Sequence, residues 1–471
     1  MIEISVINVV IGAGTAGLAA YRALVAAGQE AVLIERGPHG TTCARVGCMP
    51  SKLLIAAAEA VHGVSRWETF GIRLEGQVQV DGRAVMNRIK RERDRFVGFV
   101  LDGVSAIPDK HRIVGQARFV DPGTVEVDGG LRIRFKKAVI ATGSSPVIPS
   151  MLQGLDERVI VNDDVFDWHD LPRSVAVFGT GVIGLELGQA LHRLGVLVHM
   201  FGRGGSVGPL TDPALKDYAV QTFGRELALE AGARLTGAHR TRDGVLLEWQ
   251  DGQGVAQRTE VDAVIAATGR APNVVGLGLE HLGLAMQSNG VPVFNRHTLQ
   301  CGNSPIFIAG DANHDVPLLH EAADEGRIAG ENAATYPSVT AGLRRAPLGI
   351  VFSDPQMATV GSRWADLQKA EVVIGKVSFE DQGRSRVMLR HQGLLHVYAD
   401  RNSGKFLGAE MMGPDAEHLA HLMAWALQLN TTVEDMLKLP FYHPVVEEGL
   451  RTALRDAVAQ RARLAQLQSA A

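Results

Sequence analysis

The chain has little of several features that mark particular classes of protein. Only three of its 471 residues are cysteine, which is too few for a disulfide scaffold. No uninterrupted apolar run is long enough to span a bilayer, so no membrane segment is expected. The formal net charge is -4 and no basic tract stands out, which argues against a nucleic-acid partner. Cysteine and histidine are not clustered at short spacing, so no metal site is expected.

Length and composition indicate a multidomain α/β protein. The 471 residues suffice for about three domains. An apolar content of 46%, a charged content of 21% and 53 glycines are typical of this class. The first residues lack the basic start and the small-residue cleavage site of a signal peptide. We therefore expect a cytoplasmic protein.

Two of the cysteines, Cys43 and Cys48, stand with four residues between them. On a strand their α-carbons would be about 16 Å apart, and on a regular helix their side chains would point in different directions. A disulfide needs α-carbons within about 7 Å. A bridge therefore requires a bend, which Gly47 and Pro50 would allow. Taken alone, the pair is either a redox pair or two unrelated buried thiols.

A dinucleotide-binding unit is predicted at the start of the chain. The apolar run from Ile4 to Ile11 is typical of a buried strand, and a helix follows from Leu18 to Ala27. A second strand, Ala31 to Ile34, ends at Glu35. The turn between the first strand and the helix has glycine at Gly12, Gly14 and Gly17. Such a turn lets a pyrophosphate approach the helix N-terminus, and the acid can accept hydrogen bonds from a ribose.

The same pattern returns in the middle of the chain. A strand from Ser174 to Phe178 precedes a helix that runs to Arg193. The turn between them has glycine at Gly179, Gly181 and Gly184. The position of Glu35 in the first unit is taken here by Gly202, which Arg203 follows. Replacement of the acid by a nearby arginine is expected where the 2′-phosphate of NADP binds, and an ordinary loop is the alternative.

Further strands end in polar turns at Thr142-Gly143, Thr268-Gly269 and Gly310-Asp311. An aspartate at the carboxyl end of a strand suits a contact with a sugar alcohol of a cofactor. The alternative is that Asp311 caps a helix predicted near Leu318 to Ala334.

From Pro347 the pattern changes to short strands and then helices. Strands are predicted at 350–352, 371–379, 387–390 and 393–400, and helices at 417–429, 433–437 and 446–459. We thus predict an α/β fold with two Rossmann-like dinucleotide-binding domains and a C-terminal α+β domain. The predicted boundaries are 1–148 and 272–346 for the first domain, 149–271 for the second and 347–471 for the third. Near the end, His443 precedes Pro444, and Glu448 stands five positions after the histidine.

Together these segments resemble the flavin-dependent pyridine nucleotide–disulfide oxidoreductases, and the dihydrolipoamide dehydrogenases in particular. The resemblance covers nearly the whole chain. It is carried by both glycine turns, by Cys43 to Lys52, Thr268 to Asn273, Phe352 to Pro355 and Val360-Gly361, and by His443-Pro444 with Glu448.

The resemblance implies an enzyme that holds FAD in the first unit and NAD, or NADP, in the second. Cys43 would exchange with the thiol substrate and Cys48 would face the flavin, while His443 would act as a base oriented by Glu448. Lys52 would lie near the flavin and pair with Glu186. The implied FAD contacts are Gly12, Gly14, Gly17, Glu35, Thr42, Lys52, Thr142, Gly143 and Asp311. The implied nicotinamide contacts are Gly179, Gly181, Gly184, Glu186, Arg203 and Gly269.

The activity that the resemblance implies is oxidation of dihydrolipoamide by NAD+ in an obligate homodimer with shared active sites. The lipoyl group would be free or carried by a separate protein. Phe441 stands where the family usually has a histidine, which leaves the thiol substrate open. An NADPH-dependent, glutathione reductase-like enzyme is an alternative, although its gating aromatic would fall at Val182. A flavin-bound redox sensor is another, but it would not need His443 and Glu448.

Overall fold

The computed structural model describes residues 2–469 and divides into two compact units. The first unit holds the chain up to Pro50, Arg88–Val147 and Gly269–Arg344. The second holds Ser51–Asn87, Ile148–Thr268 and the chain from Arg345 onward. The boundary falls inside two helices, α3 (Cys48–Gly63) and α4 (Gly82–Ser105). The division into three domains stays a prediction.

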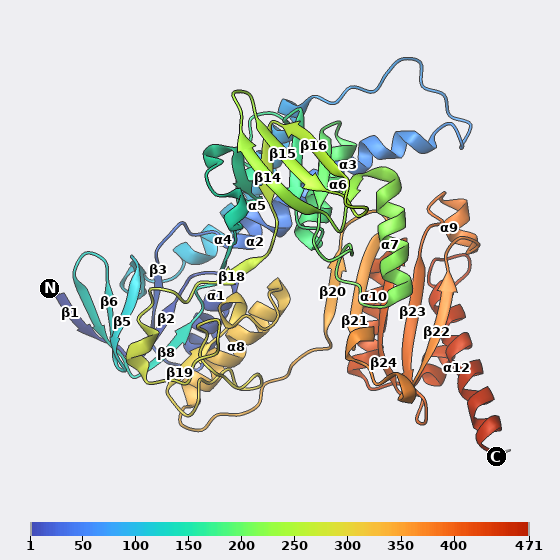
Figure 1. The fold of residues 1–471 in the computed structure, drawn as a ribbon. Helices are drawn as coiled ribbons and strands as arrows, with labels where there is room; N and C mark the ends of the chain where they lie inside the picture. Colours follow the sequence, from blue (N-terminus) through green and yellow to red (C-terminus); the bar gives the residue numbers. More distant parts are fainter. Residues whose placement is uncertain (1, 470–471) are drawn as a thin grey trace. The chain divides into compact units, whose positions relative to one another are not determined.

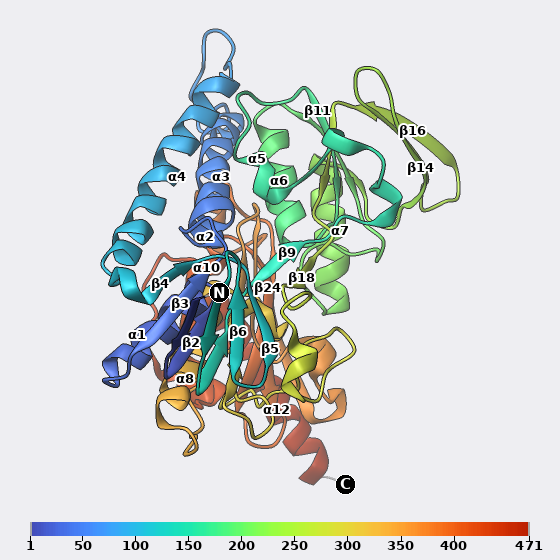
Figure 2. The same ribbon diagram turned by 90° about the vertical axis from the view of Figure 1, so that its left-hand side faces the viewer.

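A parallel five-stranded sheet is the centre of the first unit (Figures 1 and 2). Its strands in spatial order are β4 (Arg112–Val114), β3 (Ala31–Glu35), β2 (Asn8–Ile11), β8 (Lys137–Ile140) and β19 (Ile306–Ile308). The strands are aliphatic because both faces of the sheet are covered. Helices α1 (Thr15–Ala26) and α8 (Leu319–Thr335) pack on one face. A small sheet packs on the other, formed by β1 (Ile2–Ser5), β7 (Leu131–Arg134), β6 (Thr124–Val127) and β5 (Ala117–Asp121).

The predicted single strand from Ile4 to Ile11 is in fact two strands, β1 and β2, in different sheets. The chain passes between the sheets at Val6 and Ile7. There the Val6 N–H donates to the Arg134 carbonyl, and the Ile7 carbonyl accepts from Lys137. The prediction was wrong because an apolar run shows burial and does not show which sheet buries it.

The second unit contains a parallel sheet in which four neighbouring strands repeat the order of the first unit, while the fifth strand, β10, comes before the others in the sequence instead of after them. Its strands are β13 (Ala228–Glu230), β12 (Leu197–Phe201), β11 (Ser174–Phe178), β17 (Ala263–Ala266) and β10 (Val159–Val161), all parallel. Helix α6 (Val182–Arg193) follows β11, as α1 follows β2. An antiparallel sheet packs on this unit through aromatic side chains, Phe178, Phe201 and Trp249. Its strands are β14 (Arg234–Arg240), β15 (Val245–Gln250) and β16 (Ala256–Val261).

The rest of the second unit contains an antiparallel sheet backed by helices (Figure 1). Its strands in spatial order are β20 (Leu348–Val351), β21 (Gln356–Gly361), β24 (Phe406–Gly413), β23 (Leu394–Asp400) and β22 (Val372–Ser378). Helices α10 (Ala416–Gln428), α11 (Val433–Lys438) and α12 (Glu448–Ser469) complete its core.

Two features of this sheet differ from the prediction. The strand expected at 387–390 is absent, because the segment ends a short helix, α9 (Gly383–Val387), that the Gln382 side chain caps. The inner strands β21 and β24 were not predicted, since glycine and small residues interrupt their apolar pattern.

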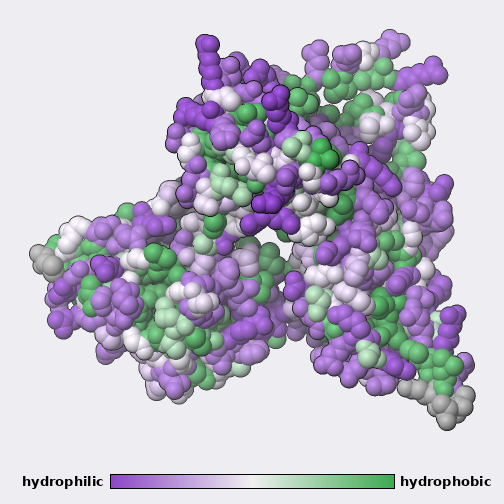
Figure 3. Space-filling view, viewed as in Figure 1, coloured by the Kyte–Doolittle hydropathy of each residue, from purple (hydrophilic) through white to green (hydrophobic). Residues whose placement is uncertain are grey.

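The remaining described elements connect these sheets. They include α5 (Asn162–Val165), α7 (Pro213–Glu226), β9 (Ser144–Pro146), β18 (Arg270–Pro272) and short 3-10 turns. Hydrophilic side chains cover most of the face in Figure 3, with smaller hydrophobic areas between them. Within residues 2–469, no helix combines the length and the apolar character that crossing a membrane requires.

Candidate active site

The cysteine segment bends sharply between its two thiols. Helix α2 (Thr42–Val46) contains Cys43 and ends at Gly47, and α3 starts at Cys48. Gly47 is not helical, with φ -125° and ψ -114°. A Cβ added there would lie 3.3 Å from the Cys43 α-carbon, so the chain returns toward Cys43 at this point. The predicted bend is therefore present at Gly47, while Pro50 lies within the first turn of α3.

The local backbone presents the two thiols differently. The Thr41 hydroxyl accepts a hydrogen bond from the Ala44 N–H and so caps α2. Cys43 is half-buried, and Cys48 is exposed. The third cysteine, Cys301, is fully buried, and burial raises the pKa of its thiol to about 12. At neutral pH Cys301 is protonated, so it is a poor nucleophile.

The first glycine turn has the shape of a dinucleotide cradle. A Cβ at Gly12 would overlap the Ala141 carbonyl, and one at Gly17 would overlap the carbonyl of Gly12. By contrast, the space around Gly14 is open, and no side chain caps helix α1 at this residue. The N-terminal end of α1 therefore has room for a pyrophosphate, which its N–H groups and dipole favour.

Glu35 and Asp311, which are predicted to contact FAD, form hydrogen bonds within the turns around this cradle. Glu35 accepts hydrogen bonds from the Ala13 N–H at 2.7 Å and from the Gly37 N–H at 2.9 Å. Asp311 accepts one from the Ser144 hydroxyl at 2.7 Å. Helix α8 starts after Leu318 without a side-chain cap, so the alternative reading of Asp311 as its cap is wrong.

Two other predicted residues of the first unit have structural partners of their own. The Thr142 hydroxyl donates to the Asn273 carbonyl at 2.7 Å, and the following Gly143 has φ +71°, a conformation that favours glycine. Gly269, predicted to bind the nicotinamide cofactor, belongs by its contacts to the first unit, where its carbonyl accepts from the Val147 N–H.

The second glycine turn repeats the first in detail. A Cβ at Gly179 would overlap the Ala267 carbonyl, and one at Gly184 would overlap the carbonyl of Gly179. The space around Gly181 is open, and α6 also begins without a side-chain cap. Both turns thus leave the same part of a helix N-terminus available for a phosphate group.

The second unit has Gly202 at the position that Glu35 takes in the first unit, and the reason is steric. A Cβ at Gly202 would lie 2.6 Å from the Thr180 hydroxyl and 2.8 Å from the Ala231 carbonyl. A glutamate therefore does not fit where the first unit has Glu35. Arg203 follows on the surface and forms no ion pair within residues 2–469.

Lys52 and Glu186 form an ion pair in the second unit. The Lys52 Nζ lies 2.7 Å from the Glu186 Oε2, and Glu186 is 5% exposed. The other oxygen of Glu186 accepts the Phe352 N–H at 2.9 Å, and the Lys52 ammonium lies 4.6 Å from the centre of the Phe352 ring. Both charges are therefore held in one arrangement, with a cation–π contact in addition.

His443 and Glu448 also meet, as the family resemblance implies. The His443 Nδ1 lies 3.0 Å from the Glu448 Oε2, at the start of α12. The hydrogen bond to His443 lowers the pKa of the Glu448 carboxyl, so Glu448 is ionised at neutral pH. The His443 side chain is 81% exposed. Its second ring nitrogen, Nε2, is therefore open to another molecule.

Sequence reasoning did not single out three residues that line the same small cavity as Glu186 and bind one another. These are Gln189 and Arg193 on α6 and Asp354 after β20. The signal was present, because Asp354 lies in the segment Phe352 to Pro355 on which the family resemblance partly rested. What the sequence could not show is that this segment pairs with α6.

The chain belongs to the pyridine nucleotide-disulphide oxidoreductase family. The family profile matches residues 8–326, and the profile of its dimerisation domain matches residues 348–454. The protein is therefore a flavoprotein disulfide oxidoreductase that uses FAD and NAD(P), which confirms the predicted class and cofactors. The dimerisation domain supports the predicted homodimer.

Relatives and solved structures agree with this class. The dihydrolipoyl dehydrogenase of Geobacillus stearothermophilus is 30% identical over 460 residues, which cover 94% of both chains. That of Haloferax volcanii is 30% identical over 473 residues, 96% of both chains. LpdA from Mycobacterium tuberculosis has the same fold, with a TM-score of 0.82, 24% identity and coverage of 96% of this chain and 99% of LpdA. The HOCl-induced flavoprotein disulfide reductase RclA from Escherichia coli, solved as a Cu(II) complex, also has this fold. Its TM-score is 0.81 at 21% identity, with coverage of 97% of this chain and 99% of RclA.

Proposed function

We propose that the protein oxidises dihydrolipoamide with NAD+ through a redox disulfide of Cys43 and Cys48. The observation that carries the proposal is the His443–Glu448 pair, which presents an oriented and exposed imidazole. A dithiol must lose protons before it can attack a disulfide, and histidine can exchange a proton near neutral pH. The names of the relatives that are 30% identical give further support.

The proposed exchange runs as two thiol–disulfide steps. A substrate thiolate attacks the Cys43 sulfur, the Cys43–Cys48 bond breaks, and Cys48 leaves as a thiolate. The second substrate thiol gives its proton to His443 and attacks the mixed disulfide, so lipoamide leaves as a disulfide and Cys43 becomes a thiolate. His443 accepts the substrate proton, while the ionised Glu448 holds the ring and stabilises its charged form. Bound FAD would supply the two-electron chemistry that links the reduced cysteine pair to the nicotinamide.

The chain's own residues have separate tasks around the cofactors. The two glycine turns would bind the pyrophosphates, and Glu35 and Asp311 would contact sugar alcohols of FAD. Lys52 would place its charge near the flavin, where a cation stabilises an anionic reduced ring. Because His443 is exposed in the single chain, we propose that it serves the disulfide of the partner subunit.

A steady-state assay with the FAD-loaded protein tests this proposal. We expect turnover with dihydrolipoamide and NAD+, and a loss of about 100-fold or more in kcat/KM for the His443→Gln variant. A matched control is His239→Gln, because His239 is also an exposed histidine beside a glutamate, Glu248. Full dihydrolipoamide turnover by the His443→Gln variant would rule out the proposed base.

A second candidate is an NADPH-dependent disulfide reductase, and the packing of Gly202 favours it. Since no acid fits at Gly202 and Arg203 lacks an ion-pair partner within residues 2–469, a 2′-phosphate could pair with Arg203. In this case 2′,5′-ADP should bind more tightly than 5′-ADP, and Arg203→Gln should lower the ratio of the two affinities about tenfold. Arg258→Gln is a suitable control on the exposed strand β16. Equal binding of both nucleotides would favour NAD.

A further inference from the structure

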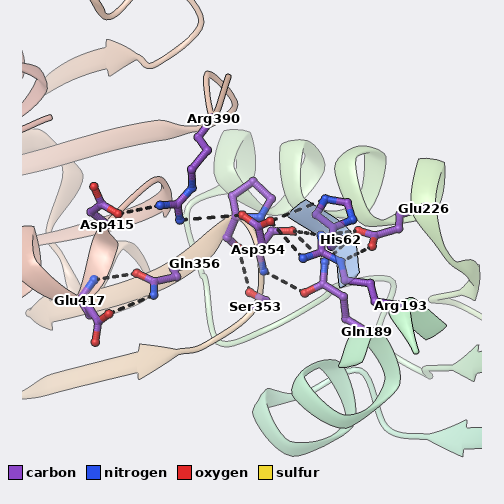
Figure 4. Close-up of polar contacts among 11 residues, drawn as sticks. His62, Gln189, Arg193, Glu226, Ser353, Asp354, Gln356, Arg390, Asp415 and Glu417 are labelled. Atoms are coloured by element: carbon purple, nitrogen blue, oxygen red, sulfur yellow. Dashed lines mark hydrogen bonds and ion pairs between the residues drawn. The ribbon is translucent and has the colours of Figure 1, made fainter. Parts of the chain in front are cut away.

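Three polar residues on one face of α6 bind a single short segment. They are Glu186, Gln189 and Arg193, whose spacing of three and four places them on the same side of the helix. The segment is Phe352 to Asp354, directly after β20. Figure 4 shows Gln189 and Arg193 directed at Asp354.

The contacts are reciprocal and specific. Gln189 accepts the Asp354 N–H at 2.8 Å and donates to the Asp354 carbonyl at 2.7 Å. Arg193 donates to the Asp354 carboxylate at 3.0 Å and to its carbonyl at 3.2 Å. Together with the bond from the Phe352 N–H to Glu186, these contacts fix the register of the segment along the helix. We call Gln189, Arg193 and Asp354 the α6 clamp.

Two members of the α6 clamp lie in the interior of their unit, and the Asp354 side chain is 22% exposed. Gln189 is 3% exposed, and the Arg193 side chain is 6% exposed. Burial alone would raise the pKa of the Asp354 carboxyl, but Arg193 and Arg390 hold it below its usual range. Buried ion pairs of this kind are no more stabilising than well-packed apolar residues, because desolvation opposes them. What the directional contacts of the clamp do is fix one geometry.

Further contacts connect the α6 clamp to neighbouring helices. Gln189 and Arg193 donate to the Glu226 carboxylate at the end of α7, at 2.8 Å and 2.6 Å. The His62 ring of α3 lies 3.9 Å from the Asp354 carboxylate, and α3 also carries Lys52. On the other side, Arg390 lies 4.0 Å from Asp354 and 2.9 Å from Asp415 at the start of α10 (Figure 4).

A small cavity separates α3 from the clamp. Its lining includes Ile55 and Ala58 of α3, Glu186, Gln189 and Arg193 of α6, and Asp354. Lys52 extends from α3 and is held by its ion pair with Glu186 and by its contact with the Phe352 ring.

We propose that Gln189, Arg193 and Asp354 are positioning residues that hold the Lys52–Glu186 pair at the flavin. The clamp holds the segment that contains Phe352, and the Phe352 N–H donates to one oxygen of Glu186. The other oxygen of Glu186 binds the Lys52 ammonium. This inference rests on the proposed place of Lys52 beside the flavin. It does not depend on which thiol the enzyme uses.

The midpoint potential of the bound flavin tests the proposal, since it needs no thiol substrate. Lys52→Met should make the potential more negative, because a cation that favours the reduced anion is lost. Gln189→Met and Asp354→Asn should shift it in the same direction. In a Glu186→Gln background the same two substitutions should add little, since they act through Glu186. Arg193→Lys keeps the charge and should cause a smaller shift than Arg193→Gln.

A control separates positioning from general stability. Asp212 and His396 form a buried ion pair of 2.7 Å in the same unit and contact none of the three clamp residues, so Asp212→Asn should lower the melting temperature and leave the potential unchanged. FAD content is measured for every variant, so that a loss of folded, FAD-loaded protein is not mistaken for a shift in the midpoint potential. The proposal is overturned if Lys52→Met shifts the potential while Gln189→Met and Asp354→Asn do not, or if Lys52→Met has no effect. Failure of dihydrolipoamide turnover alone would affect the proposed function and not this inference.

Discussion

At the residue scale, the three cysteines differ in burial, and burial decides which of them can react. Cys48 is exposed and Cys43 half-buried, on either side of the bend at Gly47. Cys301 is fully buried next to β19, and burial raises the pKa of its thiol to about 12. Only a thiolate is an effective nucleophile, so exchange belongs to the first pair.

Alkylation at pH 8 checks this assignment. After mild reduction of the native protein, iodoacetamide should label Cys43 and Cys48 and leave Cys301 unmodified, since its thiol stays protonated and covered. Peptide mass spectrometry identifies the labelled sites. The same reagent applied to unfolded protein should label all three, and rapid labelling of native Cys301 would contradict the burial argument.

Asp354 gives a prediction for the pH dependence of stability. Although burial opposes ionisation, Arg193 and Arg390 lower the pKa of this carboxyl in the folded protein. Its contribution is therefore present above the unfolded pKa of about 3.9 and is lost as the pH falls through the folded value. Asp354→Asn should cost about 1–3 kcal/mol of unfolding free energy at pH 7. Urea unfolding at pH 7 and below pH 4 should show this difference shrinking in acid, and a constant difference would be inconsistent with an ionised Asp354.

At the element scale, the two glycine turns repeat one another down to single contacts. Gly12 and Gly179 each approach the carbonyl of the residue directly after the neighbouring parallel strand, while Gly17 and Gly184 each approach the carbonyl of the first glycine of their own turn. The middle glycine is open in both. Backbone approach therefore explains the outer glycines, and ligand approach explains the middle one.

Substitutions in the second turn separate these two roles. Gly184→Ala should cost about 1–3 kcal/mol or more, because its Cβ would overlap the Gly179 carbonyl. Gly181→Ala should fold like the wild type, since nothing of the chain lies within 4 Å of the added Cβ, and weaken binding of the nicotinamide nucleotide. Thermal melting and nucleotide titration measure the two effects. Equal melting temperatures for both variants would show that Gly184 is not sterically required.

The same contrast shows how far the sequence predicts this molecule. The glycine turns and Glu35 follow from local spacing, and the family resemblance implied the His443–Glu448 pair. The break at Val6 and Ile7, the helix α9 and the α6 clamp depend on partners far along the chain. Nothing in the spacing of Gln189 indicates that its amide binds residue 354, which is 165 positions away.

At the scale of the whole molecule, the chain carries a dimerisation domain, and one helix of it has an apolar exposed face. On α10 and at its end, Leu422 is 41% exposed, Trp425 64% and Leu429 75%. Their spacing of three and four places them on one side of the helix. An apolar face of this kind is typical of an interface between subunits.

Trp425→Arg should weaken the dimer by about 2 kcal/mol or more, or roughly 30-fold in the dissociation constant, because tryptophan is a frequent interface anchor. Sedimentation at a series of dilutions measures the effect. Leu343→Arg is a control, since Leu343 is 61% exposed in the first unit and outside the dimerisation domain. An unchanged dimer in the Trp425→Arg variant would place the interface elsewhere.

Mixing two inactive variants tests the central claim, a dithiol–disulfide enzyme in which Cys43 works with the partner's His443. Cys43→Ser and His443→Gln homodimers should each fail to oxidise dihydrolipoamide. If the subunits are unfolded and refolded together in equal amounts, half of the dimers are mixed and each has one complete site, so about a quarter of wild-type activity should return. No recovery in verified mixed dimers would contradict the shared site and with it the proposed role of His443.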